Sequence, residues 1–115
     1  MSRSRSWVFT INNWTEDDVK EIENLNAQYT VYGKECGVQG TPHLQGYVYF
    51  SSQRTRKSMK NKLTRAYLDV RHGSHEQAAQ YCKKDGDYVE TGVPPHANGR
   101  PTEEVRMERN RRLGS

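Results

Sequence analysis

The sequence has few of the residues that build a large core or a cross-linked scaffold. Only 32% of its 115 residues are hydrophobic, and only two are cysteines. Two cysteines make no disulfide framework, and neither Cys36 nor Cys82 lies in a CxxC pair, so we expect free thiols in a reducing compartment. No apolar run approaches the roughly 18 residues of a membrane span. The first residues, MSRSRSW, also lack the apolar stretch of a secretory signal. These absences predict one soluble, intracellular domain with a modest core.

The sequence does have an excess of positive charge. Its net charge is +4 and its isoelectric point is about 9.2. A basic balance indicates a polyanionic partner, of which nucleic acid is the commonest. Charge alone allows a merely basic soluble protein equally well, so the decision rests on the motifs.

Apolar periodicity and turn formers predict eight elements in the order β-α-β-β-α-β-α-β. The expected strands are 6–13, 29–35, 43–50, 67–73 and 87–92, and the expected helices are 16–25, 51–66 and 75–86. Thr15 is expected to cap the first helix, and Ser74 with Gln77 to form a capping box on the third, which Gly86 ends. This order predicts an α+β, two-layer sandwich with a central antiparallel sheet of about five strands. Helices are expected on one face, and the other is left for a ligand.

Polar side chains lie on one face of the expected strand 43–50. Successive side chains of a strand alternate between faces, so His43 and Gln45 point the same way. If the preceding strand pairs with this one as a hairpin, Glu35 meets His43. A carboxylate, an imidazole and an amide oxygen suit Mg²⁺ or Mn²⁺ better than structural zinc. The alternative is an ordinary solvated strand edge near a turn.

The third expected helix carries a second chemical pair. Tyr81 and Lys84 are three residues apart, which places them on the same helix face. A tyrosine oxygen is a nucleophile once it is deprotonated or polarised, and a nearby lysine balances the developing charge. The alternative is a surface tyrosine beside a solvated lysine, which is a common pattern.

Three segments taken together resemble one family. FTINN (9–13), HLQG (43–46) and YCKK (81–84) are similar to motifs I, II and III of the replication initiators of small circular single-stranded DNA viruses. The resemblance is nearest to circoviruses and cycloviruses, and it runs from about Trp7 to Pro95. That family is the single-tyrosine viral branch of the HUH endonucleases, whose fold has the β/α order of RNA-recognition domains. A glutamine stands at position 45 where the name-giving pattern has a second histidine, as is usual in circovirus-like members.

The resemblance implies a mechanism. Tyr81 attacks a phosphodiester of single-stranded origin DNA at a stem-loop, becomes linked to the 5′ phosphate and releases a 3′ hydroxyl, and a later attack by a 3′ hydroxyl joins a circle. Mn²⁺ or Mg²⁺, bound by Glu35, His43 and Gln45, would polarise the phosphate. Lys84 would position the ion or stabilise charge near Tyr81.

The resemblance also implies a domain organisation. Residues 1–95 would be the nicking domain and residues 96–115 a polar linker toward a helicase region, because no Gly-Lys-Ser/Thr phosphate loop occurs in this sequence. The full-length protein would act in the host nucleus, without a membrane partner. The resemblance allows homo-oligomers of the full-length protein, with this domain monomeric.

Several residues are candidates for DNA contacts. Tyr47 and Tyr49 share a face with His43 and either stack on bases or pack under a neighbouring segment. The remaining candidates are polar or basic residues: Arg5, Thr10, Asn12, Asn13, Arg54 (with the basic stretch that it begins, to Arg65) and Arg71. For each basic residue a solvated surface charge is the alternative.

Two rivals to a viral nuclease stay open at this point. One is a non-catalytic nucleic-acid-binding module of the RNA-recognition type. The other is a plasmid or bacterial replication initiator with the same chemistry.

Overall fold

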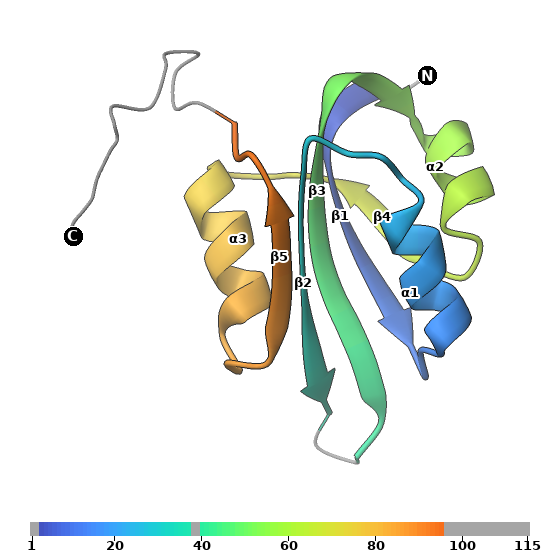
Figure 1. Ribbon diagram of the computed structural model, residues 1–115, viewed down its shortest axis with the longest axis vertical. Coiled ribbons are helices and arrows are strands. Elements are labelled where there is room, and N and C mark those ends of the chain that lie inside the picture. The colour runs from blue at the N-terminus through green and yellow to red at the C-terminus, as the bar shows by residue number, and fades with distance from the viewer. Residues whose placement is uncertain (1–2, 38–39, 96–115) are drawn as a thin grey trace.

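The chain folds around one open antiparallel sheet (Figure 1). The computed structural model describes residues 3–37 and 40–95, and the expected linker 96–115 lies outside the described residues. The elements follow the predicted order: β1 (Arg3–Asn12), α1 (Glu16–Glu23), β2 (Tyr29–Cys36), β3 (Pro42–Thr55), α2 (Arg56–Lys62), β4 (Tyr67–Val70), α3 (His75–Lys83) and β5 (Tyr88–Gly92). The strands lie in the order β4-β1-β3-β2-β5, and every neighbouring pair is antiparallel. The predicted fold class is confirmed.

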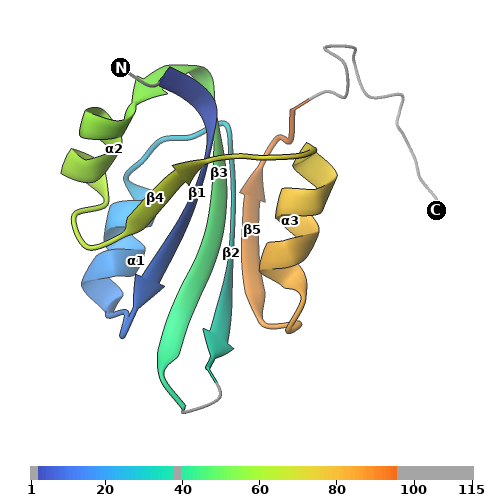
Figure 2. The same ribbon diagram turned by 180° about the vertical axis from the view of Figure 1, so that it is seen from behind.

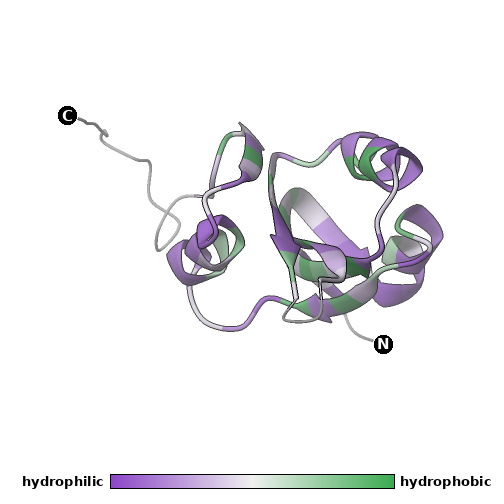
Figure 3. Ribbon diagram, turned by 90° about the horizontal axis from the view of Figure 1, so that it is seen from below, coloured by the Kyte–Doolittle hydropathy of each residue, from purple (hydrophilic) through white to green (hydrophobic). Residues whose placement is uncertain are grey.

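Helices α1 and α2 cover one face of the sheet. Their apolar side chains, among them Ile22 and Met59, pack against Phe9, Leu44 and Val48 in the larger of the two buried clusters. The even positions of β3 face this cluster, as the alternation predicted. Figure 3 shows the same division by hydropathy, because each helix carries hydrophobic residues on only part of its surface.

Helix α3 lies on the opposite face, over β2 and β3 (Figures 1 and 2). This refines the expectation that helices occupy one face. The odd face of the sheet contains buried apolar groups, since Val31 and Tyr47 are both 0% exposed. Ala79 and Cys82 of α3 cover them in a second, smaller buried cluster. The face expected to be open is therefore open only beside α3, over β1 and β4.

The boundary between β3 and α2 differs from the predicted one. Residues 51–55 were expected to begin the basic helix, but β3 continues to Thr55 and α2 begins at Arg56. The extension pairs with the start of β1, where Ser4 lies opposite Arg54. Thr55 then caps α2 by accepting a hydrogen bond from the Ser58 amide at 3.1 Å. Tertiary pairing with β1 outweighs the local helical preference here.

The predicted caps are present. The Asp18 carboxylate accepts a hydrogen bond from the Thr15 amide at 2.8 Å, and Ser74 and Gln77 form the reciprocal capping box of α3. Gly86 has a φ of +84° just after α3, the conformation in which glycine ends a helix. Such caps each stabilise a helix by about 1 kcal/mol. None of the helices within residues 3–37 and 40–95 has the length and apolar character needed to cross a membrane.

Candidate active site

The hairpin of β2 and β3 brings Glu35 and His43 together. The two residues lie directly opposite each other in the ladder, and Glu35 Oε1 is 3.0 Å from His43 Nε2. The Glu35 side chain is only 5% exposed, whereas that of His43 is 21% exposed. A carboxylate buried to this degree needs positively charged or hydrogen-bonding partners, because its desolvation is costly. The convergence expected from the short connection is present in the structure.

Gln45 lies next to this pair on the same face of β3. It is opposite Gly33 on β2 and opposite Thr10 on β1. The Thr10 hydroxyl donates to Gln45 Oε1 at 3.1 Å, and Gln45 Nε2 donates to the Phe9 carbonyl at 3.4 Å. Thr10, which was expected to contact DNA, therefore orients the Gln45 amide in this structure.

Lys84 connects the strands to the predicted nucleophile on α3. Its Nζ is 2.6 Å from Glu35 Oε2 and lies 4.2 Å from the centre of the Tyr81 ring. Burial by itself lowers the pKa of Lys84, but the hydrogen bond and the attraction of Glu35 outweigh it and raise the pKa above its ordinary value. Lys84 is therefore an ammonium that neutralises Glu35 and faces Tyr81. The Tyr81 side chain is half exposed, so a substrate can reach it.

Gly33 also shapes this site, although the motifs in the sequence did not single it out. A Cβ at position 33 would lie 1.9 Å from the carbonyl oxygen of Cys82, so only glycine lets α3 approach β2 this closely. This contact brings Lys84, two residues after Cys82, within reach of Glu35. An isolated glycine inside a predicted strand signals such a close approach, and the segment YTVYGKE carries one.

The donor set suits a hard cation with few protein ligands. Among residues 3–37 and 40–95, no group of three or more His, Cys, Asp or Glu side chains comes together to hold a metal. The expected set contains two such residues, Glu35 and His43, and an amide oxygen from Gln45. Mg²⁺ commonly keeps several waters and uses only one or two carboxylates, so a small set of this chemistry fits it. Cys82 is not a candidate ligand, because burial raises the pKa of its thiol to about 12.

The two cysteines are free, as expected. Cys36 is exposed at the end of β2, and Cys82 is buried on the side of α3 that packs on the sheet. The structure therefore has no cross-link that could hold the hairpin or the helix, and their positions depend on packing and polar contacts.

The two tyrosines expected beside the site have different environments. Tyr47 is fully buried under α3, where its hydroxyl contacts Arg71 and His75. Of the two alternatives for Tyr47, stacking on a base or packing under a neighbouring segment, the structure has the second. Tyr49 is half-buried on the same face. Arg71, another expected DNA contact, has its guanidinium directed into the protein.

The remaining expected DNA contacts are spread over the molecule. Asn12 lies opposite His43, and Asn12 and Asn13 are both exposed, so they flank the site. Arg5 is exposed near the other end of β1, about 20 Å from Asn12 by strand geometry. Arg54 stacks on the Phe50 ring at 4.3 Å, which places it on the α2 face, opposite the site.

Arg65 ends the basic segment that was expected to contact DNA, but in the structure its side chain bonds to other parts of the protein. Its Nη2 is 2.8 Å from Asp18 Oδ2 and donates to the carbonyl oxygens of Asn12 and Asn13, while its Nε donates to Asp18 Oδ1. The hydrogen bonding of Arg65 to the Asp18 carboxylate lowers the pKa of Asp18, although burial acts to raise that pKa. The Arg65 guanidinium therefore fixes the turn after β1, which presents Asn12 and Asn13.

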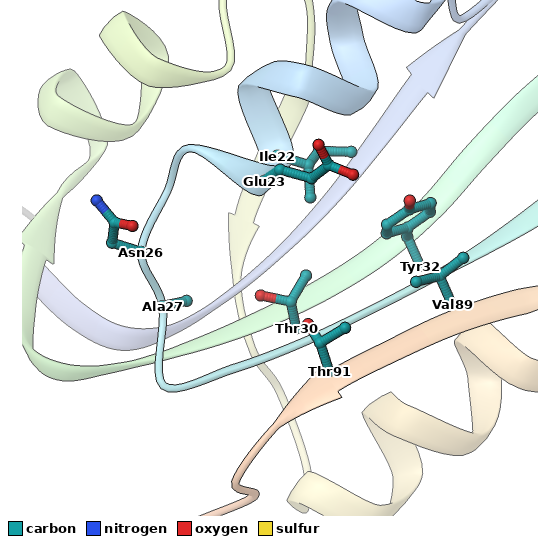
Figure 4. A pocket seen from close by; sticks show the side chains of 8 residues that line it. All are labelled: Ile22, Glu23, Asn26, Ala27, Thr30, Tyr32, Val89 and Thr91. Atoms are coloured by element: carbon teal, nitrogen blue, oxygen red, sulfur yellow. The ribbon is translucent and has the colours of Figure 1, made fainter.

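A pocket of about 250 Å³ lies on the other face of the sheet (Figure 4). Ile22 from the end of α1, Tyr32 from β2 and Val89 from β5 contribute to its wall. It holds none of the groups gathered around Glu35, which lie beside α3 on the opposite face of the sheet.

Comparison with known proteins gives an independent result. Residues 4–85 match the model of a family described as "Putative viral replication protein". The replication-associated protein of pigeon circovirus is 37% identical over 99 residues, which cover 83% of this chain and 31% of that protein. The replication-associated protein of beak and feather disease virus is 38% identical over 93 residues, covering 78% and 32%. The master replication protein of banana bunchy top virus is 40% identical over 84 residues, covering 73% and 28%. The chain thus spans about a third of the length of these curated relatives.

Proposed function

Because the chain belongs to the viral replication protein family, we propose that it is the origin-nicking domain of a viral rolling-circle replication initiator. Its substrate would be single-stranded DNA at a stem-loop origin. Its reaction would be a transesterification that cuts one strand and later rejoins it, and it would need no ATP. Because the chain spans only about a third of its relatives, further activities of a longer protein are outside this proposal.

The contact chain from Glu35 through Lys84 to Tyr81 carries the proposal. A half-exposed tyrosine lies against an ammonium, and that ammonium is held by a buried carboxylate paired with a histidine. This arrangement supports attack by tyrosine on a phosphate. A purely binding surface has no use for it.

In the proposed first step, the Tyr81 oxygen attacks phosphorus from the side opposite the leaving oxygen. A bond forms between this oxygen and phosphorus, the bond from phosphorus to the 3′ oxygen breaks, and the leaving oxygen takes up a proton to become a 3′ hydroxyl. The phenolic proton of Tyr81 passes to solvent. Lys84 stabilises the negative charge that develops on the tyrosine oxygen and phosphate. The reverse attack by a 3′ hydroxyl restores Tyr81 and rejoins the strand.

Glu35, His43 and Gln45 would hold a divalent cation, Mg²⁺ or Mn²⁺. When bound, this ion would polarise the scissile phosphate and offset its negative charge. Thr10 keeps Gln45 Oε1 in place. Lys84 would then divide its interaction between Glu35 and the reacting groups.

Adduct formation tests the proposal. The protein is incubated with Mn²⁺ and single-stranded oligonucleotides that include candidate stem-loop origins, and the products are separated on a denaturing gel. We expect a protein–DNA adduct that resists denaturation, disappears with EDTA and is absent from Tyr81→Phe. Tyr88→Phe is the matched control, because Tyr88 is also partly exposed beside a lysine, Lys83, and should keep the adduct.

Two outcomes contradict the proposal in different ways. An adduct that persists in Tyr81→Phe would show that another residue is the nucleophile. Several oligonucleotides that bind without reacting would favour the rival interpretation, a non-catalytic module of the RNA-recognition type.

A further inference from the structure

Three polar side chains, of which Tyr47 is buried and the other two are half-buried, meet at the start of α3. The Tyr47 hydroxyl accepts a hydrogen bond from Arg71 Nη1 at 3.0 Å and lies 3.0 Å from Nδ1 of His75, the first residue of α3. Tyr47 is 0% exposed, and the Tyr29 ring packs edge-on against His75 with centroids 5.1 Å apart. Arg71, Tyr47 and His75 therefore link the end of β4, the centre of the sheet and the N-terminus of α3.

One of the two hydrogen bonds has a direction fixed by its donor. A guanidinium only donates, so the Tyr47 oxygen accepts from Arg71. The hydroxyl keeps a second lone pair and its own proton, so the direction of its hydrogen bond with His75 Nδ1 is set by the tautomer of His75. Burial lowers the pKa of His75 and raises that of Tyr47, so both are neutral in the folded protein. The Arg71 Nε is also buried, which confirms that the guanidinium is directed inward.

The other end of α3 is attached to different strands. Lys83 Nζ lies 2.9 Å from Glu90 of β5, and the Tyr29 hydroxyl donates to the same carboxylate. Lys84 is bound to Glu35 of β2. A helix of nine residues is about 13 Å long, so its tilt is set by these two ends together.

We propose that Arg71, Tyr47 and His75 are positioning residues that set the tilt of α3, and so place Tyr81 against the site formed by Glu35 and His43. This inference rests on the nicking function proposed above. It assigns Arg71 to the interior cluster in place of the DNA contact expected from the sequence. A displacement of about 1 Å in a reacting group can cost a hundredfold in rate, so a buried cluster far from the phosphate can control the reaction.

Tyr47→Phe is the direct test, because it removes the hydroxyl and keeps the ring that fills the core. We expect the rate of adduct formation at saturating oligonucleotide to fall about ten- to hundredfold. The concentration that gives half the maximal rate should change by less than about twofold, since no DNA contact is lost. Tyr32→Phe is the matched control: Tyr32 is a buried tyrosine on the opposite face of β2, and its variant should keep the wild-type rate.

A second pair of variants separates positioning from general loss of structure. His75→Asn keeps an amide group near the position of Nδ1, where it can hydrogen-bond to Tyr47, whereas His75→Leu does not. We expect His75→Asn to recover most of the rate lost in His75→Leu, with both proteins folded by circular dichroism. Equal losses in the two variants would overturn the proposal, as would a Tyr47→Phe protein with an unchanged rate or with weakened DNA binding alone.

Hydrogen exchange without DNA makes the inference independent of the nicking reaction. In Tyr47→Phe, amides of α3 should exchange faster than in the wild type, while those of β1 and β3 stay unchanged. If no oligonucleotide reacts with the wild type, the nicking function fails, and faster exchange in α3 still shows that the cluster holds the helix. Unchanged exchange in α3 would show that it does not.

Discussion

At the scale of single residues, the site depends on a balance of charge around one buried carboxylate. Glu35 has an imidazole on one oxygen and an ammonium on the other, at 3.0 and 2.6 Å. Lys84 also faces the Tyr81 ring, so the same ammonium neutralises a buried group and lies against the proposed nucleophile. The carboxylate is therefore held in place by two partners before any substrate arrives.

The role of His43 can be tested separately from folding. His43→Ala should leave the far-ultraviolet circular dichroism spectrum unchanged, because the imidazole is partly exposed and lies near the end of the hairpin. We expect it to lose Mn²⁺ binding in calorimetric titration by roughly ten- to hundredfold, together with adduct formation. Loss of folding would instead mean that His43 is structural.

The Asp18–Arg65 pair predicts a pH dependence of stability. The pKa of Asp18 in the folded protein lies below its ordinary value of 3.8. A carboxyl of this kind stabilises the fold above the unfolded-state pKa, and that stabilisation is lost as the pH falls through the lower, folded value. The temperature at which the wild type unfolds should therefore fall steadily as the pH is lowered below about 4.

Asp18→Asn provides the comparison for this pH profile. At neutral pH we expect it to lower the free energy of unfolding by roughly 1–3 kcal/mol, because hydrogen bonds to a charged group are lost. Below about pH 4 its unfolding temperature should fall less steeply than that of the wild type. Parallel profiles for the two proteins would assign the acid sensitivity to other carboxyl groups.

At the scale of elements, the contact between α3 and β2 decides whether the site exists. The backbone of α3 at Cys82 lies directly over Gly33, and this brings the next turn of the chain to Glu35. The helix has small residues on its inner face, Ala79 and Cys82, so it can pack closely on the sheet. The site is therefore a property of the packing between two elements.

Gly33→Ala tests this packing. The added Cβ would lie 1.9 Å from a backbone oxygen, which cannot move without the helix. We expect a loss of roughly 1–3 kcal/mol in the free energy of unfolding, measured by urea denaturation, together with slower adduct formation. Gly37→Ala is the control, since a Cβ there meets only an ordinary contact at 3.9 Å and should be tolerated. Equal effects of the two substitutions would contradict the close-approach explanation.

At the scale of the whole molecule, the two faces of the sheet differ in what they contain. The face under α1 and α2 contains most of the core, and the face under α3 contains the polar site. Helix α2, which carries the basic residues, and helix α3, which carries Tyr81, consequently lie apart on different faces of the sheet (Figure 2). We therefore expect that a short DNA strand bound at the proposed site does not reach the basic residues of α2.

Neutralising the exposed lysines of α2 tests this division. The double variant Lys57→Ala/Lys62→Ala should change the rate of adduct formation on a short oligonucleotide by less than about twofold at moderate salt. A large, salt-dependent loss would mean that the bound DNA passes around the sheet to α2. The measurement is the initial rate of adduct formation at two ionic strengths.

The sequence by itself determined the order of the elements, the caps and the predicted site residues. Alternation along β3 and the short connection to β2 place Glu35, His43 and Gln45 together, because these relations are local in the chain. The helical spacing of Tyr81 and Lys84 is local in the same way. The same reasoning could not find the end of β3, because residues 51–55 are held in the strand by pairing with β1, more than 40 residues away in the chain.

Only the tertiary structure decided which helix lies on which face and what each basic residue contacts. Arg71 and Arg65 resemble DNA contacts in the sequence, yet one bonds to buried Tyr47 and the other to Asp18. Composition cannot distinguish these uses, since a guanidinium binds a phosphate and an interior hydroxyl or carboxylate through the same donors. The position of α3 depends on long-range contacts at Gly33, Tyr47 and Glu90. Those contacts, rather than the motif itself, bring Tyr81 and Lys84 to Glu35.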